Sequence, residues 1–478
     1  MIRLKTKKEI FLTLFLGMSV FVTTSYCQCN SDCTGTNTFF GTSAGELNTG
    51  FNNSFFGHSS GLNNTSGIEN SFFGQDAGRN NTEGGFNSFF GESSGLNNTE
   101  GNFNSFFGEN SGRLNTTGTD NSFFGRSAGF SNTTGIDNSF YGRSSGLNNT
   151  TGSSNSFYGH SSGLNNTTGS SNSFFGNSSG FNNTTGSSNS FFGHLSGLNN
   201  TTGELNSFFG LGSGQQNTSG VRNAFFGFDA GAINTTGVSN SFFGVDAGRT
   251  NSTGDFNAFF GLSAGLSNTI GSFNSLFGVD AGRNITTGSG NIAIGRGAGP
   301  TTANASQSDR LYIDLSNTFG NDDPLIYGEF DNDFVRINGT FEVTAGLTNP
   351  SSITLKDRFS AVAPMIVLDK INQLDILEWS YKSDPSVRHI GPTAESFYEA
   401  FGLGTGGDNI STIDADGVSL IAIQALSQTL TQELEQKDQE IEALTQTLSQ
   451  ELEQKDQEIE KLQERLNRLE QLLLDEKE

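Results

Sequence analysis

The stretch that decides the fold is NSFFGNSSGFNNTTGSS (172–188), a unit that recurs through more than half of the chain. The first interval between copies is 16 residues and the other fourteen are 17, which makes sixteen copies. A short fixed period predicts a stacked solenoid, because each unit can bury its apolar face only against its neighbours. The copies close on glycines at positions 41, 57, 74, 91, 108, 125, 142, 159, 176, 193, 210, 227, 244, 261, 278 and 295.

Each unit has the composition of one β-coil. Ser-Phe-Phe favours a short strand, while the glycines and asparagines supply the backbone conformations that turns require. We therefore expect a mostly β, repetitive β-solenoid or β-roll shaft over residues 37–299. With parallel pairing of successive coils at ~4.8 Å each, the shaft would be roughly 75 Å long.

The doubled aromatic residue predicts an oligomer. Neighbouring residues on a strand point to opposite faces, so one ring of each pair faces the interior and the other lies outside. The outer row begins at Phe39 or Phe40. At ~150 Å² per ring it would expose on the order of 2,000 Å², more than a soluble monomer tolerates. A homotrimer is the simplest closed arrangement that buries this row, although the row itself does not determine the number of chains.

Composition and charge exclude several classes of protein. Of the 478 residues only 33% are hydrophobic, and the net charge is −24. Nucleic acid is not an expected partner, since phosphate binding needs a cationic surface. Disordered Phe-Gly barriers, an ice-binding face at threonine pairs such as Thr133 and Thr134, and calcium at Asp76 and its equivalents are weaker interpretations. Many units lack the threonine pair or the aspartate.

The N-terminal residues predict secretion. Four basic residues precede an apolar run over residues 10–22, which is shorter than a membrane span. We assign a signal peptide to residues 1–28, and a lipid-anchored Cys27 is the alternative. A short lead at 29–36 keeps Cys29 and Cys33, which could form a disulfide in an oxidising compartment. The expected location is extracellular or at the cell surface, with no membrane span after signal removal.

Two further segments follow the shaft. Residues 300–350 contain short alternating runs starting at Leu311, Leu325 and Phe334, typical of a β-rich connector. Residues 421–478 predict a coiled coil, with an 18-residue duplication and two lysines, Lys437 and Lys455, that interrupt its apolar seam. The seam comprises Leu430, Leu434, Ile441, Leu444, Leu448, Leu452, Ile459, Leu462, Leu466, Leu469 and Leu473.

Residues 351–420 carry a series of separated motifs. SSITLKD starts at Ser351, and it is followed by LDILEWSYK (374–382), RHIGPTA (388–394), FYEAFGLG (397–404) and TIDADGV (412–418). This order, ahead of a coiled coil, resembles the peptidase S74 family, the intramolecular chaperone auto-processing domain of tail spikes and fibres. The resemblance covers roughly residues 350–478 and implies a small α+β domain. Separately, NIAIG (291–295) resembles the head repeats of trimeric autotransporter adhesins, which implies a trimeric β-roll.

The resemblance to peptidase S74 implies a self-cleaving Ser-Lys pair. In that family a Ser-Asp-x-x-x-Lys motif cuts the chain just before the serine. Ser351 and Lys356 match it, which places the cut at Pro350–Ser351, although Ser352 replaces the usual Asp and Pro350 restricts the backbone. A serine nucleophile needs a base, and a lysine serves only where desolvation lowers its pKa. His389 is a candidate supporting residue, with a purely structural role as the alternative.

These observations together predict a secreted, trimeric fibrous surface protein, adhesin-like or structural. Its C-terminal chaperone would promote trimer assembly and cleave itself off without cofactor or metal. The expected partners are other copies of the chain and an unidentified surface or host ligand. The alternatives are a phage-derived tail-fibre component and a fibre whose chaperone does not cleave. A hydrolase acting on external substrates is disfavoured, because the repeats lack periodic acidic pairs or histidines.

Overall fold

The computed structural model describes residues 37–344, 351–382, 384–404 and 407–476. The chain divides between residues 342 and 343 into two compact units, each of which is described by itself. The expected signal peptide, the cysteine-containing lead and Pro350 lie outside the described residues. Among the helices that are described, none is both long and apolar enough to cross a membrane.

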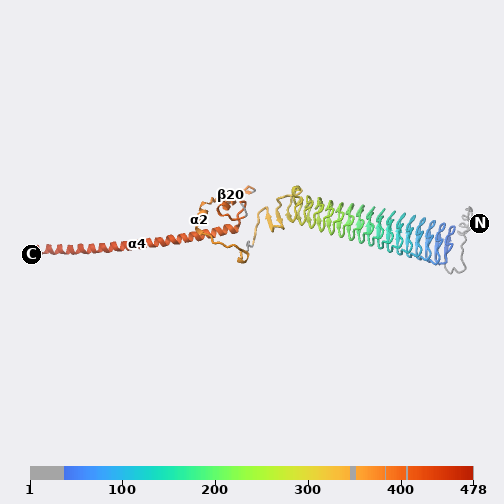
Figure 1. Cartoon of the computed structure of the whole chain (residues 1–478), viewed down its shortest axis with the longest axis horizontal. Coiled ribbons are helices and arrows are strands. Elements are labelled where there is room, and N and C mark those ends of the chain that lie inside the picture. Colours follow the sequence, from blue (N-terminus) through green and yellow to red (C-terminus); the bar gives the residue numbers. More distant parts are fainter. Residues whose placement is uncertain (1–36, 345–350, 383, 405–406, 477–478) are drawn as a thin grey trace, which may run out of the picture. The chain divides into compact units, whose positions relative to one another are not determined.

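Sixteen short parallel strands form the shaft, and they confirm the predicted solenoid (Figure 1). Each strand pairs with the next at the same position in the repeat, so that Phe55 lies opposite Phe72. The strands are β1 Thr38–Phe40, β2 Ser54–Phe56, β3 Ser71–Phe73, β4 Ser88–Phe90, β5 Ser105–Phe107, β6 Ser122–Phe124, β7 Ser139–Tyr141, β8 Ser156–Tyr158, β9 Ser173–Phe175, β10 Ser190–Phe192, β11 Ser207–Phe209, β12 Ala224–Phe226, β13 Ser241–Phe243, β14 Ala258–Phe260, β15 Ser275–Phe277 and β16 Ile292–Ile294.

The first ring of each aromatic pair forms the core. From Phe55 to Phe259 these rings are fully buried and stacked, with Phe55 and Phe72 4.8 Å apart between centroids. Leu276 and Ala293 continue the row in the last two coils. The inner row therefore starts at Phe39, and the row starting at Phe40 lies outside.

The outer row is less exposed than the sequence predicts. Its rings also stack face to face, as for Phe56 and Phe73 at 4.6 Å and 6°. From Phe56 to Phe260 each outer side chain is partly buried, whereas the terminal Phe40 is 68% exposed. The expected area is an overestimate, because it treats each ring as isolated while neighbouring rings cover both of its faces. The oligomer remains a prediction.

Asparagine side chains line the interior of the shaft, whereas the sequence predicts asparagine in the turns. The Asn70 backbone N–H donates to Asn53 Oδ1 at 2.9 Å, and Asn70 Nδ2 donates to the Gly84 carbonyl at 2.8 Å. In a second buried column, Asn81 Nδ2 donates to Asn64 Oδ1. An amide can both donate and accept, so a stack of identical coils satisfies it at every level and permits its burial.

Glycine, serine and aspartate hold most of the turn positions with positive φ, and asparagine holds only a few, such as Asn52 and Asn110. In the second coil Gly57, Ser59 and Gly61 all have positive φ, at 143°, 57° and 56°. At Gly57 a Cβ would lie 2.3 Å from the Gly74 carbonyl oxygen of the next coil. Only glycine fits there, since neighbouring coils approach each other too closely for any side chain.

The connector continues the shaft and then closes it. After the short helix η1 (Thr302–Asn304), β17 (Arg310–Ile313) pairs in parallel with β16. β18 (Ile326–Glu329) and β19 (Phe334–Ile337) then pair antiparallel, so the three expected strands are present. The buried Tyr312 lies opposite Ala293 and ends the core row.

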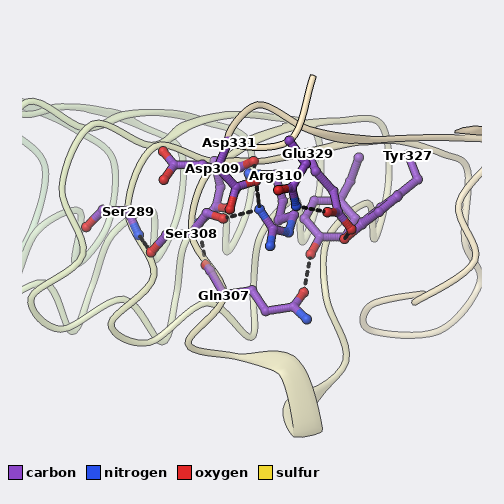
Figure 2. A network of polar contacts seen from close by, with 11 residues as sticks. Ser289, Gln307, Ser308, Asp309, Arg310, Tyr327, Glu329 and Asp331 are labelled. Carbon is purple, nitrogen blue, oxygen red and sulfur yellow. Dashed lines mark hydrogen bonds and ion pairs between the residues drawn. The ribbon is translucent and has the colours of Figure 1, made fainter. Parts of the chain in front are cut away.

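A polar network holds this end of the shaft together (Figure 2). Arg310 Nη1 donates to Asp331 Oδ1 at 2.7 Å and to the Ser308 carbonyl at 2.8 Å. The hydroxyl of Tyr312 donates to Gln307 Oε1 at 3.0 Å, and burial raises the pKa of this tyrosine. The asparagine ladder of the shaft reaches this network, since the Arg310 backbone N–H donates to Asn291 Oδ1 at 3.0 Å.

The second unit is a small α+β assembly with a long helix. Its elements are η2 (Ile353–Leu355), α2 (Pro364–Gln373), β20 (Leu377–Tyr381), β21 (Asp384–Gly391), α3 (Ala394–Phe401) and α4 (Thr412–Asp475). β20 and β21 form an antiparallel pair, and the core gathers Val367, Phe397 and Val418 from the three helices. The seam residues of α4 from Leu430 to Leu473 are 51–72% exposed, so coiled-coil pairing remains a prediction.

Candidate functional site

The candidate site is built on the short helix η2. Ser352 caps its start, since its Oγ accepts a hydrogen bond from the Thr354 backbone N–H at 3.3 Å. The Lys356 backbone N–H donates to the Ile353 carbonyl at 3.4 Å and ends the turn. The turn therefore lies between Ser351 and Lys356, the two candidate residues.

Ser351 and Lys356 do meet. Lys356 Nζ donates to Ser351 Oγ at 2.7 Å, a distance typical of a strong hydrogen bond. Both residues are exposed in the single chain. An ammonium group that donates cannot accept the hydroxyl proton, and water stabilises its charge. Ser351 and Lys356 therefore have the contact that base-assisted attack requires, but in the single chain they lack the water-excluded surroundings that it also needs.

His389 lies in a different cluster of the same unit. It faces Trp379 across the β20–β21 pair, with ring centroids 4.7 Å apart, and contacts Tyr381 edge-on at 5.3 Å. Its hydrogen-bond and ring contacts among the described residues do not include Ser351 or Lys356. The structure thus places His389 in an aromatic cluster and does not join it to the Ser-Lys pair. Trp379 is partly buried.

A cavity of about 450 Å³ lies beside this aromatic cluster. Trp379 and Tyr381 are among its lining residues, and Thr393, Glu395 and Asp408 add polar groups. Within the described part of the chain, no three His, Cys, Asp or Glu side chains are grouped so that they could hold a metal ion. Alternation of Trp379 and Tyr381 along β20 is the sequence signal that could have revealed this aromatic face.

One family model matches a segment of the chain that begins at Ser351, the candidate nucleophile. Residues 351–402 match the family model Peptidase_S74, described as chaperone of endosialidase. The Peptidase_S74 match starts at Ser351 itself and ends directly after α3. No curated protein and no solved structure matches the chain.

The match confirms the resemblance drawn from the separated motifs. It covers η2, α2, the β20–β21 pair and α3, and it stops before α4. A Peptidase_S74 match that follows a sixteen-strand solenoid along the chain supports a tail-fibre-like fibrous protein. The sequence alone missed the role of Ser352 as a cap, which the common occurrence of serine at helix N-termini could have indicated.

Proposed function

We propose that this protein is a secreted, trimeric fibre whose C-terminal segment promotes assembly and then cuts the chain between Pro350 and Ser351. The observation that carries the proposal is the 2.7 Å contact between Lys356 Nζ and Ser351 Oγ at the first residue of the Peptidase_S74 match. A serine and a lysine five residues apart would otherwise carry little information. Their contact inside a matching segment supports paired roles.

The chemistry proposed for the pair is an acyl shift followed by hydrolysis. Lys356, once neutral, accepts the Ser351 hydroxyl proton while Oγ attacks the Pro350 carbonyl carbon. The Pro350–Ser351 C–N bond breaks as the C–Oγ ester forms, and Lys356 returns the proton to the Ser351 amine. Water then hydrolyses the ester, which yields a Pro350 carboxylate and restores the Ser351 hydroxyl. The C-terminal fragment begins at Ser351.

Exposure of the pair supports control of this reaction by assembly. In the single chain water solvates both Ser351 and Lys356, and the lysine remains a donor. Packing of further copies around η2 would remove this water and favour the neutral amine. The cut would then follow correct assembly, as expected for a chaperone that leaves its finished product.

Two departures from the family pattern bear on whether the cut occurs. Ser352 stands where Asp is usual, and it accepts the Thr354 N–H in the way an aspartate cap would. The shape of η2 therefore does not require the aspartate. Pro350 restricts the peptide that is attacked, and a chaperone that assembles without cutting remains the alternative to self-cleavage.

The proposed location rests on the first residues of the sequence, and the proposed partners rest on the shaft and α4. The charged and apolar start of the sequence supports secretion, and the outer aromatic row and the α4 seam support association with further copies. The ligand of the fibre is a surface or host molecule of unidentified chemistry. A phage-derived tail-fibre component is the second candidate, because the Peptidase_S74 match applies equally to it.

Expression of the wild type beside Ser351→Ala tests the cleavage. We expect two wild-type fragments, with N-terminal sequencing of the smaller one starting at Ser351, and an intact Ser351→Ala chain. Ser360→Ala is the matched control, since Ser360 is also exposed and lies in the same segment. An intact wild-type chain in an assembled oligomer would contradict self-cleavage and leave the non-cleaving chaperone.

A further inference from the structure

One surface column of the shaft changes character along its length. It occupies the position two residues after each outer ring, directly behind the closing glycine. In the coils of β2 to β10 this position holds His58, Gln75, Glu92, Glu109, Arg126, Arg143, His160, Asn177 and His194. In the coils of β11 to β15 it holds Leu211, Phe228, Val245, Leu262 and Val279, which we call the apolar column.

The fold of the coils does not require apolar residues in the apolar column. All five side chains are 42–48% exposed. The eleven other coils, including those of β1 (Thr42) and β16 (Arg296), carry polar or charged residues at the same position, and each follows a strand and a glycine of positive φ. Since the coil forms equally well with either kind of residue, the apolar side chains must be explained by something outside the single shaft.

The apolar column lies next to the outer aromatic row. Each of its residues follows an outer ring by two positions, so the two columns of Cα atoms are at most ~7 Å apart. The outer row is also more exposed near this end, at 43% for Phe277 and 42% for Ile294. The five side chains and the outer row expose an apolar area on the order of 800 Å², comparable with one side of a stable interface.

We propose that the apolar column, with the adjacent outer rings, is the surface on which a second copy of this shaft packs. This inference rests on the proposed oligomer and specifies where its shafts touch. A second copy is the partner that fits, because its coils repeat at the same spacing. The stacked outer rings of β11 to β14 lie 4.7–4.9 Å apart, so contacts made at one coil recur at the next.

This placement gives the association a direction. The apolar column lies in the last third of the shaft sequence, nearest along the chain to the Peptidase_S74 segment. The β2 to β10 coils offer polar or charged residues at this position and hold shafts together more weakly. Association between shafts therefore begins at the β11 to β15 coils and extends toward β1.

Site-specific photo-crosslinking in the full chain tests this surface. Val245 is replaced by p-benzoylphenylalanine, and Gln75 is replaced likewise as the matched control at the equivalent position. We expect a linked product of two chains at Val245, with a yield at least fivefold above that at Gln75. A link from Val245 to residues 343–478 of the same chain, or equal yields at the two positions, would overturn the proposal.

A companion variant tests the same surface without a crosslinker. It carries Leu211→His, Phe228→Asn, Val245→Arg, Leu262→Gln and Val279→Glu, residue types that other coils already hold at this position. We expect unchanged β-content and an oligomer that dissociates at a protein concentration at least tenfold higher. An unchanged dissociation concentration refutes the surface alone, whereas a monomeric wild type refutes the proposed oligomer as well.

Discussion

The shaft and the C-terminal unit differ in how far a single chain buries their side chains. In the shaft nearly every interior group finds its partner one coil away in the same chain, as Asn81 does with Asn64. In the C-terminal unit the core is small, and α4 exposes a long row of leucines and isoleucines. The comparison teaches that a periodic sequence completes its interior within one chain, whereas the second unit leaves the apolar row of α4 uncovered in the single chain.

Removal of an interior ring gives the largest effect that this comparison predicts. Phe174 is fully buried and stacks on Phe191 at 4.7 Å, while Phe175 is its outer neighbour. We expect Phe174→Ala to lower the free energy of unfolding by about 3–5 kcal/mol, and Phe175→Ala by clearly less in a shaft held as a monomer. Denaturant titration of the two variants checks this, and equal losses would contradict the assignment of inner and outer rows.

Shortening of the α4 seam tests the dependence on other copies. Leu448 and Leu452 are exposed in the single chain, so their replacement by alanine leaves a monomer unharmed. In a coiled coil the same double change costs about 2–5 kcal/mol for each buried leucine. Analytical ultracentrifugation should show dissociation of the variant at a concentration where the wild type is assembled. Gln450→Ala, away from the seam, is the control and keeps the wild-type mass.

The buried amide columns predict a smaller loss within the shaft. Asn183 Nδ2 donates to Asn166 Oδ1 at 2.7 Å, and Asn183 Oδ1 accepts from Asn200 at 2.7 Å. Asn183→Ala leaves buried groups without partners and should cost about 1–3 kcal/mol. Asn182→Ala, one residue away in a partly exposed ladder, should cost less. Hydrogen exchange of the neighbouring coils measures both, and faster exchange in the Asn182 variant would argue against the interior role.

The cap of η2 gives the smallest predicted effect. Ser352→Ala removes the acceptor for the Thr354 N–H, worth about 1 kcal/mol. If this energy positions the pair, self-cleavage should slow roughly fivefold, and Ser352→Asp should restore the wild-type rate. A time course of fragment appearance checks both variants. Equal rates for all three chains would show that the cap does not control the distance between Ser351 and Lys356.

Much of the shaft could be predicted from its sequence, and the errors have identifiable physical causes. The period fixes the coil, and strand alternation places one ring of each pair inside. Alternation alone does not say which ring, because both positions hold Phe in most units. Asparagine was assigned to turns from its usual preference, yet a repeat places an identical amide above and below each one. That repetition is what permits burial of Asn53 and its equivalents.

The candidate site was predictable only in part. The positions of Ser351 and Lys356 came from a family resemblance, and η2 explains why residues with that spacing come into contact. The location of His389 could not be read from its neighbours along the chain, because it depends on pairing with Trp379 across two strands. The family resemblance thus indicated the Ser-Lys pair, while the aromatic cluster required tertiary structure.

The identical coils also make the length of the fibre adjustable in whole steps. Each coil bonds to the next through the same positions. The Asn70 backbone N–H donates to Asn53 Oδ1, and the Asn87 backbone N–H donates to Asn70 Oδ1. Insertion of one 17-residue copy therefore meets compatible neighbours on both sides and lengthens the shaft by ~4.8 Å. A duplication or deletion in the gene that adds or removes whole 17-residue units therefore changes the length of the shaft and preserves the contacts between coils. The length of the fibre can thus evolve in steps of one coil.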